Sequence, residues 1–216
     1  MERVEQEIID YIEAEILPKY AKLGGHTGDH IERVISRSLK FHRQAPELNI
    51  NMVYVIAAYH DLGRLVDNDT HNIESAKMLR TDEFIKAHFS TDEMDIMAEA
   101  IEDHRSSLGH KPRSRYGELV SSADRDINID TMLSRVYDYT KHLHPEMSES
   151  EILEEARYHL RIKYAPDGYA AGTMYFEDPD FDMVLVKVEE VTRSPEVFAK
   201  IMREHNAKRK VGADKK

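Results

Sequence analysis

Apolar residues recur at intervals of three and four along almost the whole chain, and this spacing is the feature that most restricts its fold. Such spacing places apolar side chains along one face of a helix. No alternation of apolar and polar residues, typical of a half-buried strand, persists in the sequence. The sequence therefore predicts an all-α protein, with helices along the stripe from Val4 to Ile16, from Thr27 or Asp29 onward, and over residues 51–61, 72–81, 92–105, 116–128, 130–143, 148–164, 181–193 and 195–206.

The longest interior stretch without this spacing covers residues 165–180. We expect it to be a structured connection between helices, and a lid over a site is the alternative.

Composition and charge narrow the class of protein. The 216 residues are 41% apolar and 33% charged, and no apolar run approaches the roughly 20 residues that a membrane-spanning helix needs. There is no cysteine, which excludes disulfides, thiolate metal ligands and a cysteine nucleophile. The net charge of −11 argues against a protein that coats nucleic acid, because phosphate binding relies on accumulated lysine and arginine. The N-terminal residues lack the basic and apolar regions of a signal peptide, so we expect a cytoplasmic protein.

One apolar segment ends in a pair of residues that needs an explanation. Every residue from Val53 to Tyr59 is apolar or aromatic, and His60 and Asp61 follow directly. Burying a carboxylate is costly unless it is paired, protonated or bound to a metal ion. The carbonyl groups at the end of a helix increase this cost, because they repel a negative charge. Asp61 therefore needs a positive partner.

Polar side chains stand on buried faces at three further places. His30 lies at the edge of an apolar helical face, His104 continues the apolar face of residues 94–101, and Asp124 shares a face with Val120. One such residue is more often a hydrogen-bonded core residue than a ligand. Several of them on separate helices instead indicate a metal site built in the centre of a helical bundle.

These residues belong to four short motifs, which follow one another as GDHIERVI, AAYHDLGR, AIEDHR and SSADRD. In these motifs the chain resembles the HD-domain superfamily of metal-dependent phosphohydrolases. That superfamily is marked by a histidine on one helix, a His-Asp doublet at the end of a second helix, and a later aspartate. The resemblance covers about residues 26–128. It implies a single HD-like helical domain over residues 1–207, with the C-terminal helices at 130–207, and we expect a charged, flexible tail at 208–216.

The resemblance implies that His30, His60, Asp61 and Asp124 bind a divalent metal ion. Imidazole and carboxylate ligands without a thiolate suit Mn, Fe, Co, Ni or Zn. A bound ion would also supply the positive charge that Asp61 needs.

The number of ions depends on two more histidines. Some members of the superfamily have two histidines between the doublet and the last aspartate and hold a second ion, and His71 and His104 stand in those places. We therefore expect one or two ions, with His71 either a ligand or a contact to phosphate. Asp61 and His104 are the predicted catalytic residues. His26 either orients the site through a hydrogen bond or belongs to a turn.

Cations cluster near the same motifs. A guanidinium group matches the oxygens of a phosphate, so we expect phosphate contacts from these side chains, with Arg64 and Arg125 the best placed of Arg33, Arg64, Lys77, Arg105 and Arg125. The alternative is that some of them form salt bridges with the many acidic residues.

The motifs and the cations together predict an enzyme. We expect a metal-dependent phosphohydrolase in which a metal-activated hydroxide cleaves a nucleotide or another small phosphate ester or anhydride. A di-iron oxygenase of the HD type and a non-catalytic HD domain that binds a nucleotide are the alternatives. The expected partner is a small phosphate-bearing substrate, with a nucleotide as the first choice, and neither a membrane nor extended nucleic acid. Whether the chain forms a homodimer stays open.

Overall fold

The computed structural model describes residues 3–23, 27–166 and 168–213. All secondary structure in these ranges is helical and no strand occurs in them, which confirms the predicted all-α fold. Contacts divide the chain into two compact units, residues 1–124 with 174–177 and residues 125–173 with 178–216. We describe each unit by itself, and the single domain over residues 1–207 stays a prediction.

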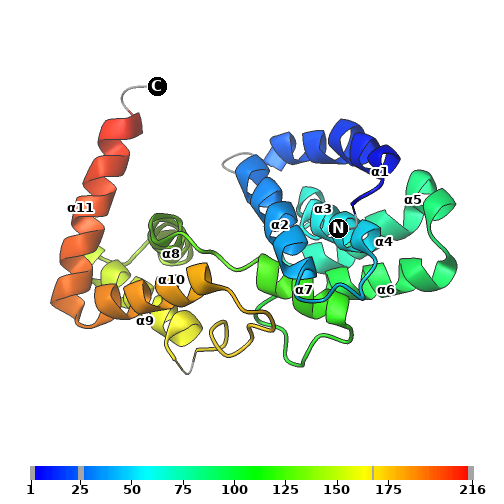
Figure 1. Ribbon diagram of the computed structural model, residues 1–216. Helices are drawn as coiled ribbons and strands as arrows, with labels where there is room; N and C mark the ends of the chain where they lie inside the picture. Colours follow the sequence, from blue (N-terminus) through cyan, green and yellow to red (C-terminus); the bar gives the residue numbers. More distant parts are fainter. Residues whose placement is uncertain (1–2, 24–26, 167, 214–216) are drawn as a thin grey trace. The chain divides into compact units, whose positions relative to one another are not determined.

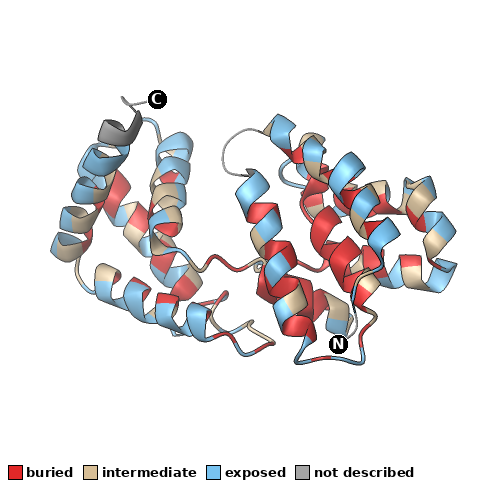
Figure 2. Cartoon of the chain, turned by 45° about the horizontal axis from the view of Figure 1, so that its top comes forward, coloured by how far each residue is buried: buried red, intermediate tan, exposed pale blue. Residues whose placement is uncertain are grey.

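The first unit is built around one buried helix, α3. The helical segments of this unit are α1 (Gln6–Tyr11), η1 (Ile12–Ile16), η2 (Leu17–Leu23), α2 (Thr27–His42), α3 (Ile50–Tyr59), η3 (Leu62–Leu65), α4 (His71–Thr81), α5 (Glu83–His88), α6 (Thr91–Glu102) and α7 (Arg115–Ala123) (Figure 1). The side chain of Asn49 caps the start of α3 by accepting hydrogen bonds from the main-chain N–H groups of Asn51 and Met52. Every residue of α3 except Asn51 is buried, because α3 packs against α2, α4, α6 and α7 (Figure 2).

The second unit consists of four helices, α8 (Ile129–Leu143), α9 (Glu149–Tyr164), α10 (Pro179–Thr192) and α11 (Pro195–Ala213). Ser148 and Glu151 form a reciprocal capping box that begins α9. α9 packs against each of the other three helices, and its apolar face forms the core of this unit. No helix among the described residues of either unit is long and apolar enough to cross a membrane.

Several helix ends differ from the sequence-based prediction. α6 ends at Glu102 instead of residue 105, and α7 ends at Ala123 instead of residue 128. α5 was not predicted, because six residues are too few to show a helical period. α11 continues to Ala213, so residues 208–213 of the predicted flexible tail are helical, and residues 214–216 lie outside the described part.

The stretch at residues 165–180 contains no helix before Pro179 among its described residues. Part of it belongs to the first unit, where Phe176 stacks on Phe41 with 5.5 Å between ring centroids. The guanidinium carbon of Arg115 lies 4.1 Å from the centre of the Phe176 ring. Residues 174–177 thus complete the core of the first unit.

Candidate metal centre

Three helices of the first unit end next to candidate ligands. His60 and Asp61 follow the end of α3, His104 lies two residues beyond α6, and Asp124 directly follows α7. The last carbonyl groups of a helix lack partners within the helix and carry a partial negative charge. Helix ends that meet at such ligands favour a bound cation.

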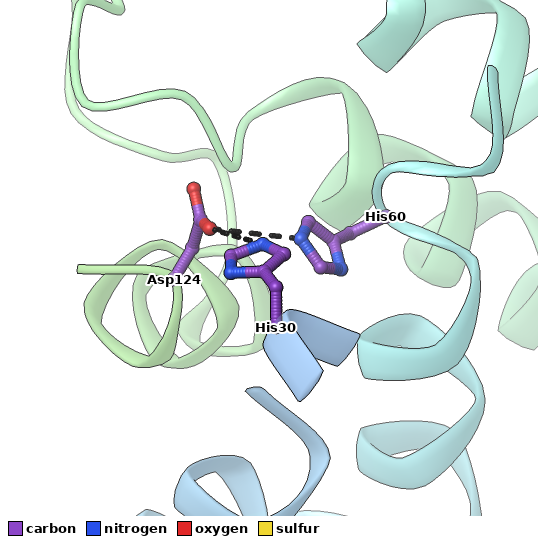
Figure 3. A group of neighbouring side chains, drawn as sticks. All are labelled: His30, His60 and Asp124. Carbon is purple, nitrogen blue, oxygen red and sulfur yellow. Dashed lines mark ion pairs between the residues drawn. The ribbon is translucent and has the colours of Figure 1, made fainter. Parts of the chain in front are cut away.

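The first ligand group consists of His30, His60 and Asp124. The Nε2 atoms of His30 and His60 lie 3.2 Å and 3.6 Å from Oδ1 of Asp124. Figure 3 shows the two imidazole rings, from α2 and from the end of α3, turned toward this carboxylate at the end of α7. All three ligand atoms lie close enough to one another to bind a single ion.

The second ligand group consists of His71 and His104. Their Nε2 atoms lie 3.2 Å apart. Both also face Oδ1 of Asp61, at 3.3 Å from His71 and 3.7 Å from His104. The sequence left the role of His71 open, and the structure brings this residue, at the first turn of α4, next to His104.

Asp61 lies between the two groups. While Oδ1 faces the second group, Oδ2 lies 3.6 Å from Nε2 of His30 and 3.8 Å from Nε2 of His60. Each oxygen of this one carboxylate therefore faces a different pair of imidazoles.

The imidazoles after α3, after α6 and at the start of α4 are held in the same way. In each of these rings Nδ1 lies 2.7–2.8 Å from the main-chain carbonyl oxygen three residues earlier, which pairs His60 with Ala57, His71 with Asn68 and His104 with Ile101. A carbonyl only accepts, so this partner assigns the ring proton to Nδ1 and leaves a lone pair on Nε2. Lone pairs that face one another across 3.2 Å in a buried site favour a cation bound between them.

Burial and the carboxylates set the charges of these groups. Burial lowers the pKa of His104 to about 4 and also lowers the pKa of His71, so both rings are neutral at pH 7. Burial would raise the pKa of Asp61, but a hydrogen bond from His30 and the charge of Arg64 hold it well below its usual range.

His30 differs from the other three histidines. Burial lowers its pKa, but hydrogen bonds to Asp124 and Asp61 outweigh burial and raise the pKa to about 9. Nη2 of Arg33 lies 2.9 Å from Nδ1 of His30, and because a guanidinium only donates, this contact opposes a proton on Nδ1. In either charge state the proton of Nε2 faces the carboxylates, and a metal ion at this place would replace it.

Two atoms of the site fit a bound ion directly. Nε2 of His60 and Oδ1 of Asp61 are buried and make no hydrogen bond with any described residue. Buried polar atoms normally have a partner, so these two indicate a ligand that the protein chain does not supply. Four imidazoles and two carboxylates form a donor set that fits a divalent transition metal ion.

The predicted phosphate-binding cations take different positions in the structure. Nε of Arg64 forms an ion pair with Oδ2 of Asp61 at 2.8 Å, and the Arg64 side chain is 40% exposed. Arg105 donates to the main-chain oxygen of Asp69, in the turn before α4.

Two further cations of this set are engaged elsewhere. Lys77 pairs with Glu74 on the exposed side of α4. Arg125 belongs to the second unit, where it donates to the hydroxyl of Thr173 at 2.7 Å. The role of each cation in phosphate binding stays a prediction, and His26 lies outside the described residues.

Three residues that sequence reasoning missed close the helix ends at the site. Each donates a side-chain hydrogen bond to a main-chain carbonyl oxygen at the C-terminal end of a helix. Tyr20 donates to Ala58 of α3 at 2.8 Å, Arg37 to Ala123 of α7 at 2.6 Å, and Asn72 to Glu102 of α6 at 2.7 Å. The one sequence signal was the spacing of seven residues between His30 and Arg37, which places both on one face of α2.

Comparison with known proteins agrees with this arrangement. A family model described as the HD domain matches residues 27–129, which contain all six candidate ligands. No curated protein and no solved structure matched the chain.

Proposed function

We propose that this chain, whose residues 27–129 form an HD domain, is a metal-dependent phosphohydrolase that cleaves a nucleotide or another small phosphate ester or anhydride. The observation that carries the proposal is the position of Asp61. Its two oxygens face two different pairs of imidazoles, and it lies at the end of a buried helix. HD domains are commonly hydrolases of this class.

Either ligand group together with Asp61 would hold one ion, through imidazole Nε2 atoms and carboxylate oxygens. A divalent ion bound there would acidify a water molecule and neutralise charge on a phosphate. The chain supplies the rest of the arrangement. Main-chain carbonyls fix the orientation of three imidazoles, and Arg64 fixes Oδ2 of Asp61.

Exposure supports a small substrate. The side chain of Asp124 is 24% exposed, whereas those of the other five candidate ligands are at most 7% exposed. A substrate would therefore reach the ions from the side of Asp124. Arg64 is partly exposed beside Asp61, and its guanidinium would hold a phosphate oxygen there.

The test is a screen of the metal-free protein reloaded with Mn, Fe, Co, Ni or Zn, against nucleotides, cyclic dinucleotides and simple phosphoesters. We expect phosphate release that depends on the metal. Asp61→Ala should lose the bound metal and essentially all activity with near-normal helicity. Asp82→Asn is the matched control, since Asp82 is another carboxylate of the first unit, bonded to Tyr11 and Tyr59. Full metal occupancy in Asp61→Ala would contradict the proposed site.

The second candidate, a di-iron oxygenase, is favoured by one observation. His71 and His104 complete a set of six ligands, which suits two iron ions as well as two ions of a hydrolase. Oxygen uptake by the iron-loaded protein without phosphate release would favour this candidate. Nucleotide binding without either reaction would favour a non-catalytic domain.

A further inference from the structure

Two hydrogen bonds at the site, one buried and one partly buried, connect helices that each carry a candidate ligand. Arg37 lies on α2, two turns after His30, and its Nη1 donates to the main-chain oxygen of Ala123, the last residue of α7. Asp124 is the next residue. One side chain of α2, that of His30, thus faces the carboxylate of Asp124 at 3.2 Å, and another, that of Arg37, holds the main chain directly before it.

The second ligand group has the same arrangement. Asn72 follows His71 at the start of α4, and its Nδ2 donates to the main-chain oxygen of Glu102, the last residue of α6. His104 lies two residues further along. This hydrogen bond therefore ties the backbone that carries His71 to the backbone that carries His104.

We propose that Arg37 and Asn72 are positioning residues for different ions, Arg37 for the ion of the first ligand group and Asn72 for the ion of the second. The inference rests on the proposed metal site. Ligand atoms must stand within a few tenths of an ångström of their places for a metal to bind well. A hydrogen bond between two ligand-bearing helices fixes the distance between the ligands, and residues that orient ligands typically change metal affinity by about 10–100-fold when they are removed.

The packing of both residues supports positioning of the backbone. Arg37 is buried, and its guanidinium lies over the ring of Phe41, so the side chain has little freedom to move. The side chain of Glu102 is held as well, because Nη2 of Arg113 donates to the Glu102 carboxylate at 2.6 Å. The main-chain carbonyl that Asn72 reaches is thus fixed, and the hydrogen bond locates α4 against it.

The test measures the affinity for each ion by titrating the metal-free protein with Co²⁺ and following its absorption, with elemental analysis of the loaded protein. His30→Ala and His104→Ala assign the two binding steps. Asn72→Leu, which keeps the size but removes the donor, should weaken the second ion about tenfold or more and leave the first within twofold. Arg37→Met should do the reverse, and Arg37→Lys, which keeps a donor, should restore part of the affinity.

The chain offers a matched control for each variant. Nε of Arg157 donates to the main-chain oxygen of Thr192, the last residue of α10, and so makes the same kind of contact in the second unit. Gln44 donates from its amide to the main-chain oxygen of Glu177, as Asn72 does to Glu102. Arg157→Met and Gln44→Leu should change the melting temperature without changing either affinity for Co²⁺.

The possible outcomes separate this inference from the proposed function. Two bound ions whose affinities are unchanged in Asn72→Leu and Arg37→Met would overturn the inference alone. Equal losses for both ions in both variants, or equal losses in the controls, would also overturn it, because they indicate general destabilisation. The expected crossed losses without any phosphate release would support the inference and overturn the proposed function. A wild-type protein that binds no ion would overturn both.

Discussion

The pKa values of His30 and His104 are shifted in opposite directions, although both residues belong to one site. Two carboxylates raise the pKa of His30 to about 9 against the effect of burial, whereas burial lowers the pKa of His104 to about 4. A metal ion must replace the proton on His30, but it finds His104 already deprotonated at neutral pH. The two ions should therefore respond differently to pH.

We expect the affinity for the first ion to fall as pH falls, while the affinity for the second ion stays nearly constant between pH 9 and pH 6.5. Below pH 9 His30 binds a proton that competes with the metal, and one pH unit corresponds to a factor of about ten at most. Because the pKa values of His71 and His104 are lowered, protons compete with the metal for these two residues only at lower pH. Co²⁺ titrations at several pH values measure both slopes. Two equal slopes would contradict this assignment of the protons.

A substitution of Arg64 tests whether its guanidinium, which pairs with Asp61, also binds the substrate. Arg64→Ala should retain bound metal but weaken a phosphate substrate by about 1.5–3 kcal/mol, the usual contribution of a hydrogen bond to a charged group. The bound ions would still supply the charge that Asp61 needs. Steady-state kinetics and elemental analysis of one preparation measure both effects. Lys86→Ala removes an exposed cation that pairs with Glu83 and serves as the control.

At the scale of elements, helical spacing predicted most helices of both units, because most of them have one buried face, whereas α3 is buried on all sides. It did not predict where α6 and α7 end. Arg113 binds the carboxylate of Asp103 directly after α6, and Arg37 binds the last carbonyl of α7, so residues distant in sequence determine these ends. The spacing alone continues past both points.

The same limit applies to the site. Its ligands could be predicted, because histidine and aspartate on apolar faces are conspicuous and stand in known motifs. Arg37 and Asn72 could not be assigned a role, because they bind main-chain carbonyls. Every residue has such a carbonyl, and only the packing of helices shows which one a side chain reaches.

Gly63 shows how closely two elements of the site approach. A Cβ atom at this position would clash with the main-chain oxygen of His71 and lie 2.5 Å from the main-chain nitrogen of Ser75. Gly63→Ala should therefore push α4 away, destabilise the fold by about 1–3 kcal/mol and weaken the second ion. Urea unfolding and metal analysis measure both effects. Gly28→Ala is the control, since a Cβ there meets nothing within 4 Å.

At the scale of the whole molecule, the chain does not divide at one point. Residues 174–177 return to the first unit from within the second, and Phe176 packs against Phe41 there. The HD-domain match ends at residue 129, so it leaves out part of the core around its own ligands. The stability of the first unit should consequently depend on a residue far beyond these motifs.

Bound metal should stabilise the first unit, which contains Phe176, against unfolding. It should leave the unfolding of the second unit, which contains Phe181, unchanged. A ligand stabilises only the unit that it binds, and Phe176 belongs to the first unit, whereas Phe181 is buried in the second. Phe176→Ala and Phe181→Ala should each lower the stability of their own unit by about 3 kcal/mol or more. Denaturant unfolding, followed with and without metal for the wild type and both variants, measures this. A metal-dependent transition that Phe181→Ala lowers as much as Phe176→Ala would show that the metal centre depends equally on the core of the second unit.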